Sequence, residues 1–145
     1  MRKLSVTKIQ LDEFVEVCRT KNLNITYQRI KIYEALSKID THPTAEDIYK
    51  IVKKEYPSIS LATVYKTLET FAENNLISKV NFLHDLARYD GNTSPHHHLV
   101  CVKCKKIVDV NDKRLQEIKI PESSKNGFQM LGYRIQFEGI CDNCQ

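Results

Sequence analysis

The sequence predicts an α+β protein of two domains, an N-terminal winged helix-turn-helix domain and a small C-terminal α/β domain. Three observations support this prediction: apolar residues recur at helical spacing before Asp90, they alternate with polar residues after it, and two Cys-x-x-C pairs lie in the second part. A chain of 145 residues with 41% apolar content can form two small cores. We expect the first domain to cover residues 1–88, a hinge to cover 89–94 and the second domain to cover 95–145.

The first three helices are marked by capping residues and by apolar spacing. Thr26 is a good N-cap for the second helix, and Thr44 with Asp47 has the spacing of a capping box at the start of the third. Apolar residues at helical spacing mark the first two helices, with Leu11, Phe14, Val15 and Cys18 in one and Ile32, Leu36 and Ile39 in the other.

A fourth helix is predicted over residues 60–74. Ser60 is its N-cap, and Asn74-Asn75 should end it because asparagine tolerates the left-handed conformation of a C-cap. Val64, Leu68 and Phe71 form its apolar face, and the polar residues lie on another face. The candidate DNA contacts on this helix are Ser60, Thr63, Tyr65 and Lys66, and Thr67 shares their face.

A short hairpin is expected next, with strands at 77–82 and 87–90 and a turn around 83–86. Several helices followed by a hairpin indicate a winged helix-turn-helix, whose last helix would enter a major groove. A helical bundle with an exposed polar face is the alternative. The net charge of +4 supports nucleic-acid binding only weakly.

The second domain reads as strands at 96–104, 105–110 and 132–141, with a helix near 113–118. A unit of about 55 residues has a small core. Metal binding, and strand pairing with a second copy of the chain, would each add stability.

Four of the five cysteines form two Cys-x-x-C pairs, which suit a closed tetrahedral Zn²⁺ site that stabilises the fold. Disulfides are disfavoured in a reducing cytosol, whereas redox-active dithiols remain an alternative. Lys105 follows the first pair at a position where glycine often supplies a positive φ, so strain is expected in that loop. The predicted ligands of a structural zinc are Cys101, Cys104, Cys141 and Cys144.

A second set of metal-capable residues lies around the first cysteine pair. On a strand, His96 and His98 point to the same face, and Asp109 follows on the next strand. Asp90 at the end of the wing and His42 before the third helix would join them if the two domains fold against one another. Imidazoles and carboxylates without thiolates suit Fe²⁺ or Mn²⁺ as well as Zn²⁺. The alternative is a solvated run of histidines.

Five motifs, in order along nearly the whole chain, resemble the ferric uptake regulator (Fur) family of bacterial metal-dependent repressors: TYQRIKIYEAL, HPTAEDIYK, SLATVYKTLETF, HHHLVCVKCKKIVDV and GYRIQFEGICDNC. The resemblance implies a homodimer, with a winged-helix domain that binds operator double-stranded DNA and a C-terminal dimerisation domain stiffened by Zn(Cys)₄. It also implies a regulatory site for Fe²⁺ or Mn²⁺, formed by His42, Asp90, His96, His98 and Asp109.

Within the family, the chain is most similar to the peroxide-sensing branch. Asp109 stands where iron-sensing members commonly have glutamate, and Pro95 and Tyr133 stand where they often have histidines of a further site. Lys66 is basic, as in iron-sensing members, so an iron-sensing repressor is the alternative.

The resemblance also implies a mechanism. Peroxide is reduced at bound Fe²⁺, the resulting oxidant attacks His42 or His96, the metal site loosens and repression ends. Mn²⁺ would fill the site without that chemistry.

Other classes of function have less support. The amino terminus lacks the apolar segment of an export signal, and no stretch approaches the ~20 apolar residues that span a bilayer, so we expect a cytoplasmic protein with no membrane partner. A metalloenzyme would need a separate general base and a substrate pocket, and we expect no enzyme activity and no organic cofactor. A thiol-disulfide redox protein is the remaining alternative.

Overall fold

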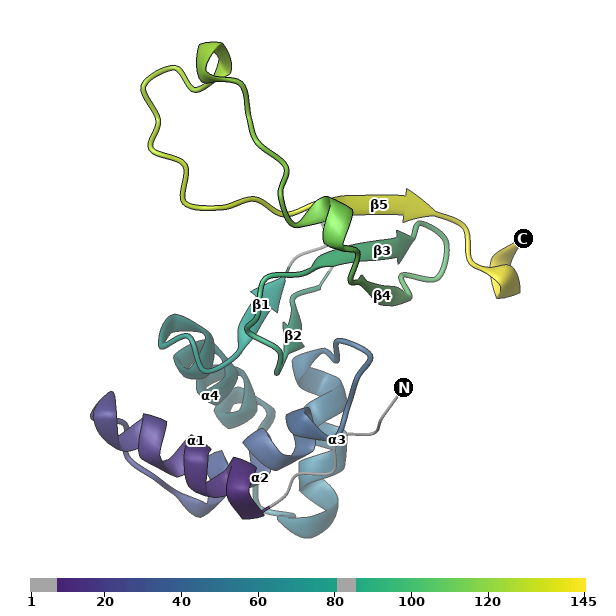
Figure 1. Ribbon diagram of the computed structural model, residues 1–145. Coiled ribbons are helices and arrows are strands. Elements are labelled where there is room, and N and C mark those ends of the chain that lie inside the picture. Colours follow the sequence, from purple (N-terminus) through teal and green to yellow (C-terminus); the bar gives the residue numbers. More distant parts are fainter. Residues whose placement is uncertain (1–7, 81–85) are drawn as a thin grey trace. The chain divides into compact units, whose positions relative to one another are not determined.

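The computed structural model describes residues 8–80 and 86–145, and it divides the chain into two compact units between Thr93 and Ser94 (Figure 1). The predicted hairpin turn at 83–86 and the end of the strand before it fall largely outside the described residues. Among the described helices, none is long and apolar enough to cross a bilayer.

The N-terminal unit contains four helices and a two-stranded antiparallel sheet in its described part. The sheet pairs Lys79 with Tyr89, which confirms the predicted wing strands. The elements are α1 (Lys8–Thr20), α2 (Tyr27–Ser37), α3 (Ala45–Glu55), α4 (Leu61–Glu73), β1 (Ser78–Val80) and β2 (Arg88–Asp90).

The helix ends follow the capping chemistry expected from the sequence. The Thr26 hydroxyl accepts a hydrogen bond from the Arg29 amide, and the Ser60 hydroxyl accepts one from the Thr63 amide. Thr44 and Asp47 form the complete capping box of α3. After α4, Asn75 adopts a φ of 58°, the left-handed conformation that asparagine tolerates. Local sequence therefore defines where these helices begin and end.

The core of the N-terminal unit lies between the helices and β2. Ile32 and Leu36 of α2 and the predicted apolar face of α4 are buried in it, whereas Ile39, also predicted for the second helix, lies after α2 and is partly buried. Thr67, expected on the polar face of α4, is buried as well. Tyr89 is fully buried, so its hydroxyl requires a partner inside the unit. The core residues are Phe14, Cys18, Ile32, Ala35, Leu36, Ala45, Ile48, Val52, Ile59, Val64, Leu68, Phe71, Ile77 and Tyr89.

The C-terminal unit contains a three-stranded sheet with strand order β4-β3-β5. β3 (His97–Cys101) is antiparallel to β4 (Ile107–Val110) and parallel to β5 (Gln136–Gly139). Short 3-10 turns follow at η1 (Lys113–Leu115), η2 (Glu122–Ser124) and η3 (Asp142–Cys144).

Four expectations for this unit are wrong in kind or extent, since β3 and β4 are also shorter than the strands predicted at 96–104 and 105–110. The helix predicted near 113–118 is a single 3-10 turn, which the Asp112 carboxylate caps by accepting a hydrogen bond from the Arg114 amide. β-branched Ile118 and Ile120, the latter directly before Pro121, disfavour continuation of the helix. The last strand covers only four of the ten residues predicted at 132–141.

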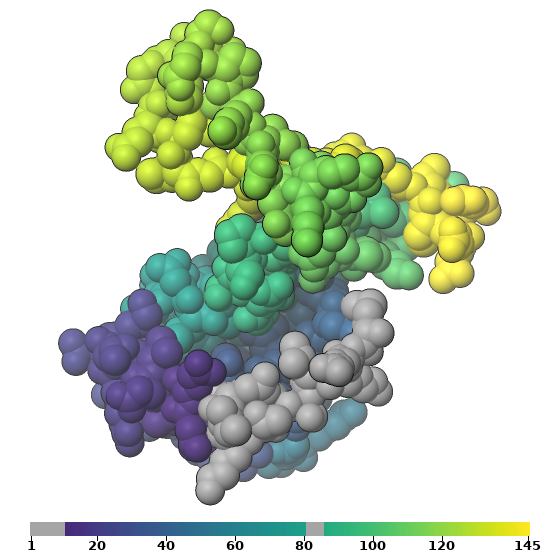
Figure 2. Space-filling model, in the orientation of Figure 1, coloured from purple at the N-terminus to yellow at the C-terminus, as the bar shows by residue number. Residues whose placement is uncertain are grey.

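Much of the segment 116–135 is a loop that projects away from the sheet of its own unit (Figure 1), and its light green atoms form a projecting lobe in Figure 2. It exposes large apolar side chains, including Phe128 at 75% and Leu131 at 94%. On the sheet itself, Leu99 lies between Val108 and Phe137 in register, and all three remain partly exposed. This unit therefore leaves much of its apolar surface uncovered.

Candidate metal centres

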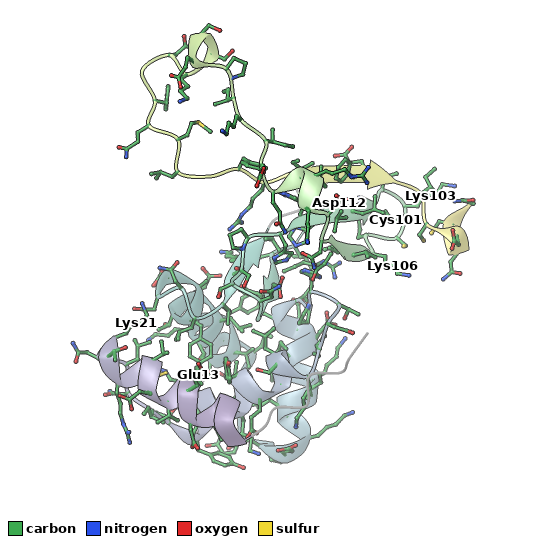
Figure 3. All side chains as sticks on the ribbon, viewed as in Figure 1. Glu13, Lys21, Cys101, Lys103, Lys106 and Asp112 are labelled. Carbon is green, nitrogen blue, oxygen red and sulfur yellow. The ribbon has the colours of Figure 1, made fainter. Side chains whose placement is uncertain are left out.

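The two Cys-x-x-C pairs meet at one end of the C-terminal sheet. Parallel pairing of β3 with β5 places Cys101 opposite Gly139, and the chain then brings Cys141 and Cys144 back toward the first pair. The four cysteine sulfurs all lie within 4.8 Å of one another. Lys103, labelled near Cys101 in Figure 3, donates a hydrogen bond to the Cys144 carbonyl at 2.8 Å and so ties the two loops together.

The sulfur spacing fits a tetrahedral metal ion. Cys104 Sγ and Cys141 Sγ are 3.6 Å apart, which is too far for a disulfide bond of about 2.05 Å. A tetrahedral Zn²⁺ with Zn–S bonds of about 2.3 Å would place its sulfur ligands roughly 3.8 Å apart. The Cys104–Cys141 separation therefore matches that of two Zn²⁺ ligands, and all four sulfurs lie close enough to share one ion.

The pKa values of the cysteine thiols also indicate that a bound cation is needed to ionise all four of them. The backbone amides of Cys104 and Cys141 donate to Cys101 Sγ at 3.5 and 3.4 Å, and they lower the pKa of Cys101 to about 6. Hydrogen bonds with the thiols of Cys141 and Cys104 raise the pKa of Cys144 to about 12. Four thiolates would repel one another at this separation, so a bound divalent cation is needed to ionise them all.

Lys105 adopts the positive φ that the sequence predicted. Its φ is 65°, and its amide donates to the Cys101 carbonyl at 2.9 Å, which closes the tight turn of the first pair. A left-handed conformation is strained for a residue with a Cβ atom.

Replacing Lys105 with glycine should therefore stabilise the zinc-loaded protein by about 0.5–1 kcal/mol, since glycine removes the steric strain. Chemical denaturation of the two proteins would measure the difference. Lys106→Gly is the matched control, because Lys106 has no positive φ and glycine there should destabilise the protein. Equal destabilisation by both glycines would show that Lys105 is not strained.

A second donor set lies at the start of the same sheet. His98 on β3 is opposite Asp109 on β4, and His96 directly precedes β3. Nε2 of His96 and Nε2 of His98 lie 3.4 and 3.5 Å from the same Asp109 oxygen, Oδ1. The three predicted residues of this unit therefore converge.

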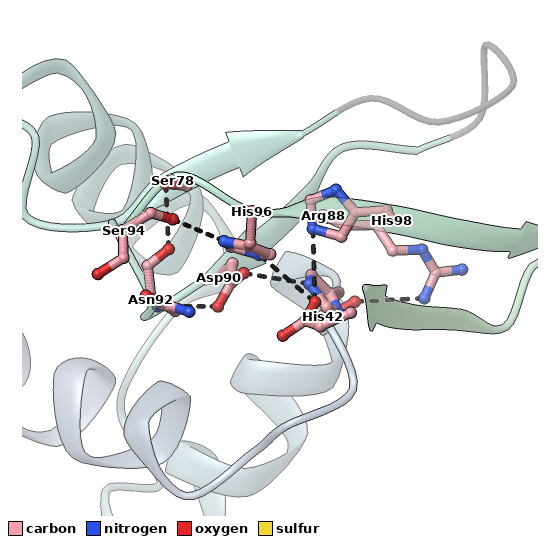
Figure 4. Close-up of polar contacts among 9 residues, drawn as sticks. His42, Ser78, Arg88, Asp90, Asn92, Ser94, His96 and His98 are labelled. Carbon is pink, nitrogen blue, oxygen red and sulfur yellow. Dashed lines mark hydrogen bonds and ion pairs between the residues drawn. The ribbon is translucent and has the colours of Figure 1, made fainter. Parts of the chain in front are cut away.

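The hydrogen bond of His96 fixes which ring nitrogen points toward Asp109. Nδ1 lies 2.7 Å from the Ser94 carbonyl, a contact dashed in Figure 4, and a carbonyl oxygen can only accept a hydrogen bond. Nδ1 therefore carries a proton, and Nε2 is the ring nitrogen directed toward Asp109. A backbone carbonyl commonly orients a metal-binding imidazole in this way.

His97 serves a different purpose from its two neighbours. Its Nδ1 accepts a hydrogen bond from the Ile135 amide at 3.1 Å, and its Nε2 lies 3.0 Å from the Leu115 carbonyl. The ring also stacks on Tyr133. His97 thus fastens the segment before β5 to β3, a role that the histidine run itself does not reveal.

The N-terminal unit contributes a pair of metal-capable residues. His42 Nε2 lies 3.1 Å from Asp90 Oδ2. Asp90 is placed by β2, and its other oxygen accepts a hydrogen bond from the Asn92 amide at 2.8 Å (Figure 4). His42 has a φ of 54°, a left-handed conformation in which histidine is among the more frequent residue types.

Backbone contacts hold the His42 segment against β2. The Tyr89 amide donates to the Pro43 carbonyl at 3.0 Å, and the Arg88 guanidinium donates to the His42 carbonyl at 3.4 Å. The five residues predicted as ligands therefore form two groups, each held by contacts within its own unit.

The candidate DNA contacts lie along the first turns of α4. Ser60 and Lys66 are exposed, and Thr63 is half-buried with its hydroxyl 2.8 Å from that of Ser60. Tyr65 is also half-buried, and its hydroxyl donates to Glu46 Oε1 at 3.1 Å. The contact between Tyr65 and Glu46 has no sequence signature.

Comparison with known proteins identifies the family. The profile of the ferric uptake regulator family matches residues 20–138. The chain belongs to the ferric uptake regulator family. This finding confirms the resemblance seen in the sequence and the α+β fold class.

Several known proteins are similar to this chain over most of their length. The peroxide operon regulator of Bacillus subtilis (strain 168) is 36% identical over 135 residues, which are 93% of each chain. The peroxide-responsive repressor PerR of Staphylococcus aureus (strain Mu50) is 33% identical over 94% of this chain and 92% of its own. Among solved structures, the Campylobacter jejuni peroxide stress regulator has a TM-score of 0.64 and 31% identity, covering 96% of this chain and 100% of its own.

Proposed function

We propose that this protein is a metal-dependent transcriptional repressor that responds to peroxide. The observation that carries the proposal is the convergence of His96 and His98 on Asp109, in a family member whose similar relatives are peroxide regulators. Asp109 supplies a single hard oxygen ligand beside two imidazoles, a combination that suits Fe²⁺ and Mn²⁺.

Two metal sites with different purposes are proposed. Zn²⁺ would be bound by the four cysteines and would stabilise the C-terminal unit, as their sulfur spacing supports. The regulatory Fe²⁺ or Mn²⁺ would be bound jointly by both units, with His42 and Asp90 from the first and His96, His98 and Asp109 from the second.

Joint binding would link the metal to DNA affinity. An ion bound by donors of both units restricts their relative orientation, and in a dimer that orientation sets the spacing of two DNA-binding helices. Metal binding and DNA binding then strengthen one another by the same factor. Contacts within each unit would hold the ligands in place for this linkage. Ser94 orients His96, Asn92 orients Asp90, and β2 holds the segment of His42.

The site supports peroxide sensing through its histidines. Bound Fe²⁺ would supply the electrons that reduce peroxide and would generate the local oxidant. His42 and His96 are the proposed targets, and an imidazole that has gained an oxygen atom is a poorer ligand. Loss of either ligand loosens the linkage and releases DNA.

The proposed partners are operator DNA and a second copy of the chain. Ser60, Thr63, Tyr65 and Lys66 of α4 are the proposed DNA contacts, on the helix that a winged helix-turn-helix places in the major groove. The partly exposed sheet residues and the apolar segment 116–135 support dimerisation through the C-terminal unit. The proposal places the protein in the cytoplasm, where bacterial DNA lies, and assigns it no enzyme activity.

An iron-sensing repressor is the second candidate, because Lys66 is exposed on α4 and matches the basic residue common in iron sensors. The two candidates differ in their response to peroxide. Iron sensing predicts DNA binding that follows the Fe²⁺ concentration without damage to a histidine.

Peroxide should add one oxygen atom to the Fe²⁺-loaded protein at His42 or His96 and should reduce its DNA affinity. The Mn²⁺-loaded protein should gain no oxygen and should keep its affinity. Peptide mass spectrometry and fluorescence anisotropy would measure both effects, with a DNA duplex selected from a random pool by the Mn²⁺-loaded protein. Oxygen found only on cysteine would instead support the thiol-disulfide alternative.

A further inference from the structure

Helix α4 makes two polar contacts from successive turns toward the rest of the N-terminal unit. Tyr65 donates from its hydroxyl to Glu46 Oε1 at 3.1 Å, and Glu69 Oε1 accepts from the Tyr89 hydroxyl at 2.7 Å. Positions 65 and 69 are four residues apart, so they lie on one side of the helix.

Both contacts lead to segments that carry the proposed metal ligands. Tyr89 directly precedes Asp90 on β2. Glu46 lies in the first turn of α3, whose N-cap, Thr44, comes two residues after His42. The hydrogen bond from the Tyr89 amide to the Pro43 carbonyl joins these two segments to each other. Polar contacts therefore connect α4 with the backbone on which both ligands of this unit are held.

A third residue, Lys79, also contacts Glu69 and so supports its hydrogen bond with Tyr89. Tyr89 is fully buried, so its hydroxyl depends on Glu69 for a partner. Lys79 on β1 lies opposite Tyr89 and 2.8 Å from the same Glu69 oxygen. Lys79 and the Tyr89 hydroxyl hold the pKa of Glu69 below its usual range, so this carboxylate is ionised at neutral pH. Glu69 thus joins α4 to both strands of the wing.

Directional bonds at two turns constrain α4 in a way that its apolar contacts do not. Val64, Leu68 and Phe71 bury the inner face of α4, but packed apolar side chains allow small rotations and translations. Hydrogen bonds at positions 65 and 69 oppose such motion, because their strength falls off steeply with geometry. A displacement of the His42 or Asp90 segment would therefore be passed to α4.

We propose that Tyr65, Glu69 and Tyr89 are positioning residues that couple the DNA-binding helix to the metal-binding segments. The inference rests on the proposed function and adds the residues that transmit metal binding within the N-terminal unit. The coupling would be measured as the ratio of DNA affinity with Mn²⁺ to DNA affinity without it.

Tyr89→Phe removes one hydroxyl and keeps the ring in the core. In the full-length zinc-loaded protein, this variant should lower the Mn²⁺-activation ratio by about threefold to tenfold. Its affinity for Mn²⁺ in the absence of DNA should stay within about twofold of the wild-type value, because no ligand is lost. Tyr56→Phe is the matched control, since the Tyr56 hydroxyl contacts Gln28 and not α4, and it should leave the ratio unchanged.

A second pair of variants separates coupling from folding. Glu69→Gln keeps an oxygen that can accept from Tyr89 and should retain most of the ratio, whereas Glu69→Ala should lower it as Tyr89→Phe does. A purely structural role would reduce both DNA affinities together and leave their ratio intact. Wild-type ratios in Tyr89→Phe and Glu69→Ala would overturn the coupling while leaving the proposed function in place. A wild-type protein with no Mn²⁺ activation would overturn both.

Discussion

Replacing His42 with alanine should abolish metal-activated DNA binding and leave a folded, zinc-loaded protein. Asp90 and His42 are the two proposed ligands of the N-terminal unit, and His42 is the one imidazole among that unit's described residues. Without it, Asp90 is the one proposed ligand left in the N-terminal unit, and because Asp90 lies three residues before the boundary between the units, it would restrict their orientation little. The variant should therefore lose the whole increase in DNA affinity that the metal causes, which is about 5–150-fold for two linked sites.

The left-handed backbone at His42 requires a second variant. Alanine at a φ of 54° is strained, and His42→Ala could lose about 1 kcal/mol of stability for that reason alone. His42→Asn tolerates this conformation and still removes the imidazole, so it should lose activation without the added strain. Fluorescence anisotropy with and without Mn²⁺, beside thermal unfolding, would measure both effects. Retained Mn²⁺ activation in His42→Asn would refute the ligand assignment.

Replacing Cys101 with serine should release zinc and unfold the C-terminal unit. This unit has a small sheet, and Val100, Cys101 and Ile107 are its buried apolar residues among those described. Structural zinc contributes about 10–16 kcal/mol in zinc-finger peptides, far more than so small a core supplies. Cys101 Sγ also accepts hydrogen bonds from backbone amides of both cysteine loops, so its replacement should separate the two loops.

Zinc content and circular dichroism would measure the effect of Cys101→Ser. The helices of the N-terminal unit should persist, because that unit has its own core. Cys18→Ala is the matched control: it removes a buried thiol from the N-terminal core and should keep one zinc ion per chain. If Cys101→Ser stays folded and loses only thiol reactivity, the cysteines form a redox switch and not a structural site.

Much of the N-terminal fold follows from local sequence. Thr26, Thr44 and Ser60 cap helices because a hydroxyl reaches an amide three residues ahead, a contact that needs no distant partner. The positive φ of Lys105 was equally predictable from the geometry of a Cys-x-x-C turn. The helix expected near 113–118 is only the turn Lys113–Leu115, and the β-branched residues Ile118 and Ile120 that follow disfavour its continuation.

The sequence alone determined which metal-capable groups this protein carries, since residue type and short spacing decide them: two soft cysteine pairs, and a run of histidines followed by an aspartate. Only the tertiary structure decided which distant group each polar side chain meets. Glu69 and Tyr89 are 20 residues apart, and His97 reaches the Ile135 amide across 38. Such partners depend on strand register and on how helices pack, which many distant residues set together, so no local pattern of sequence carries them.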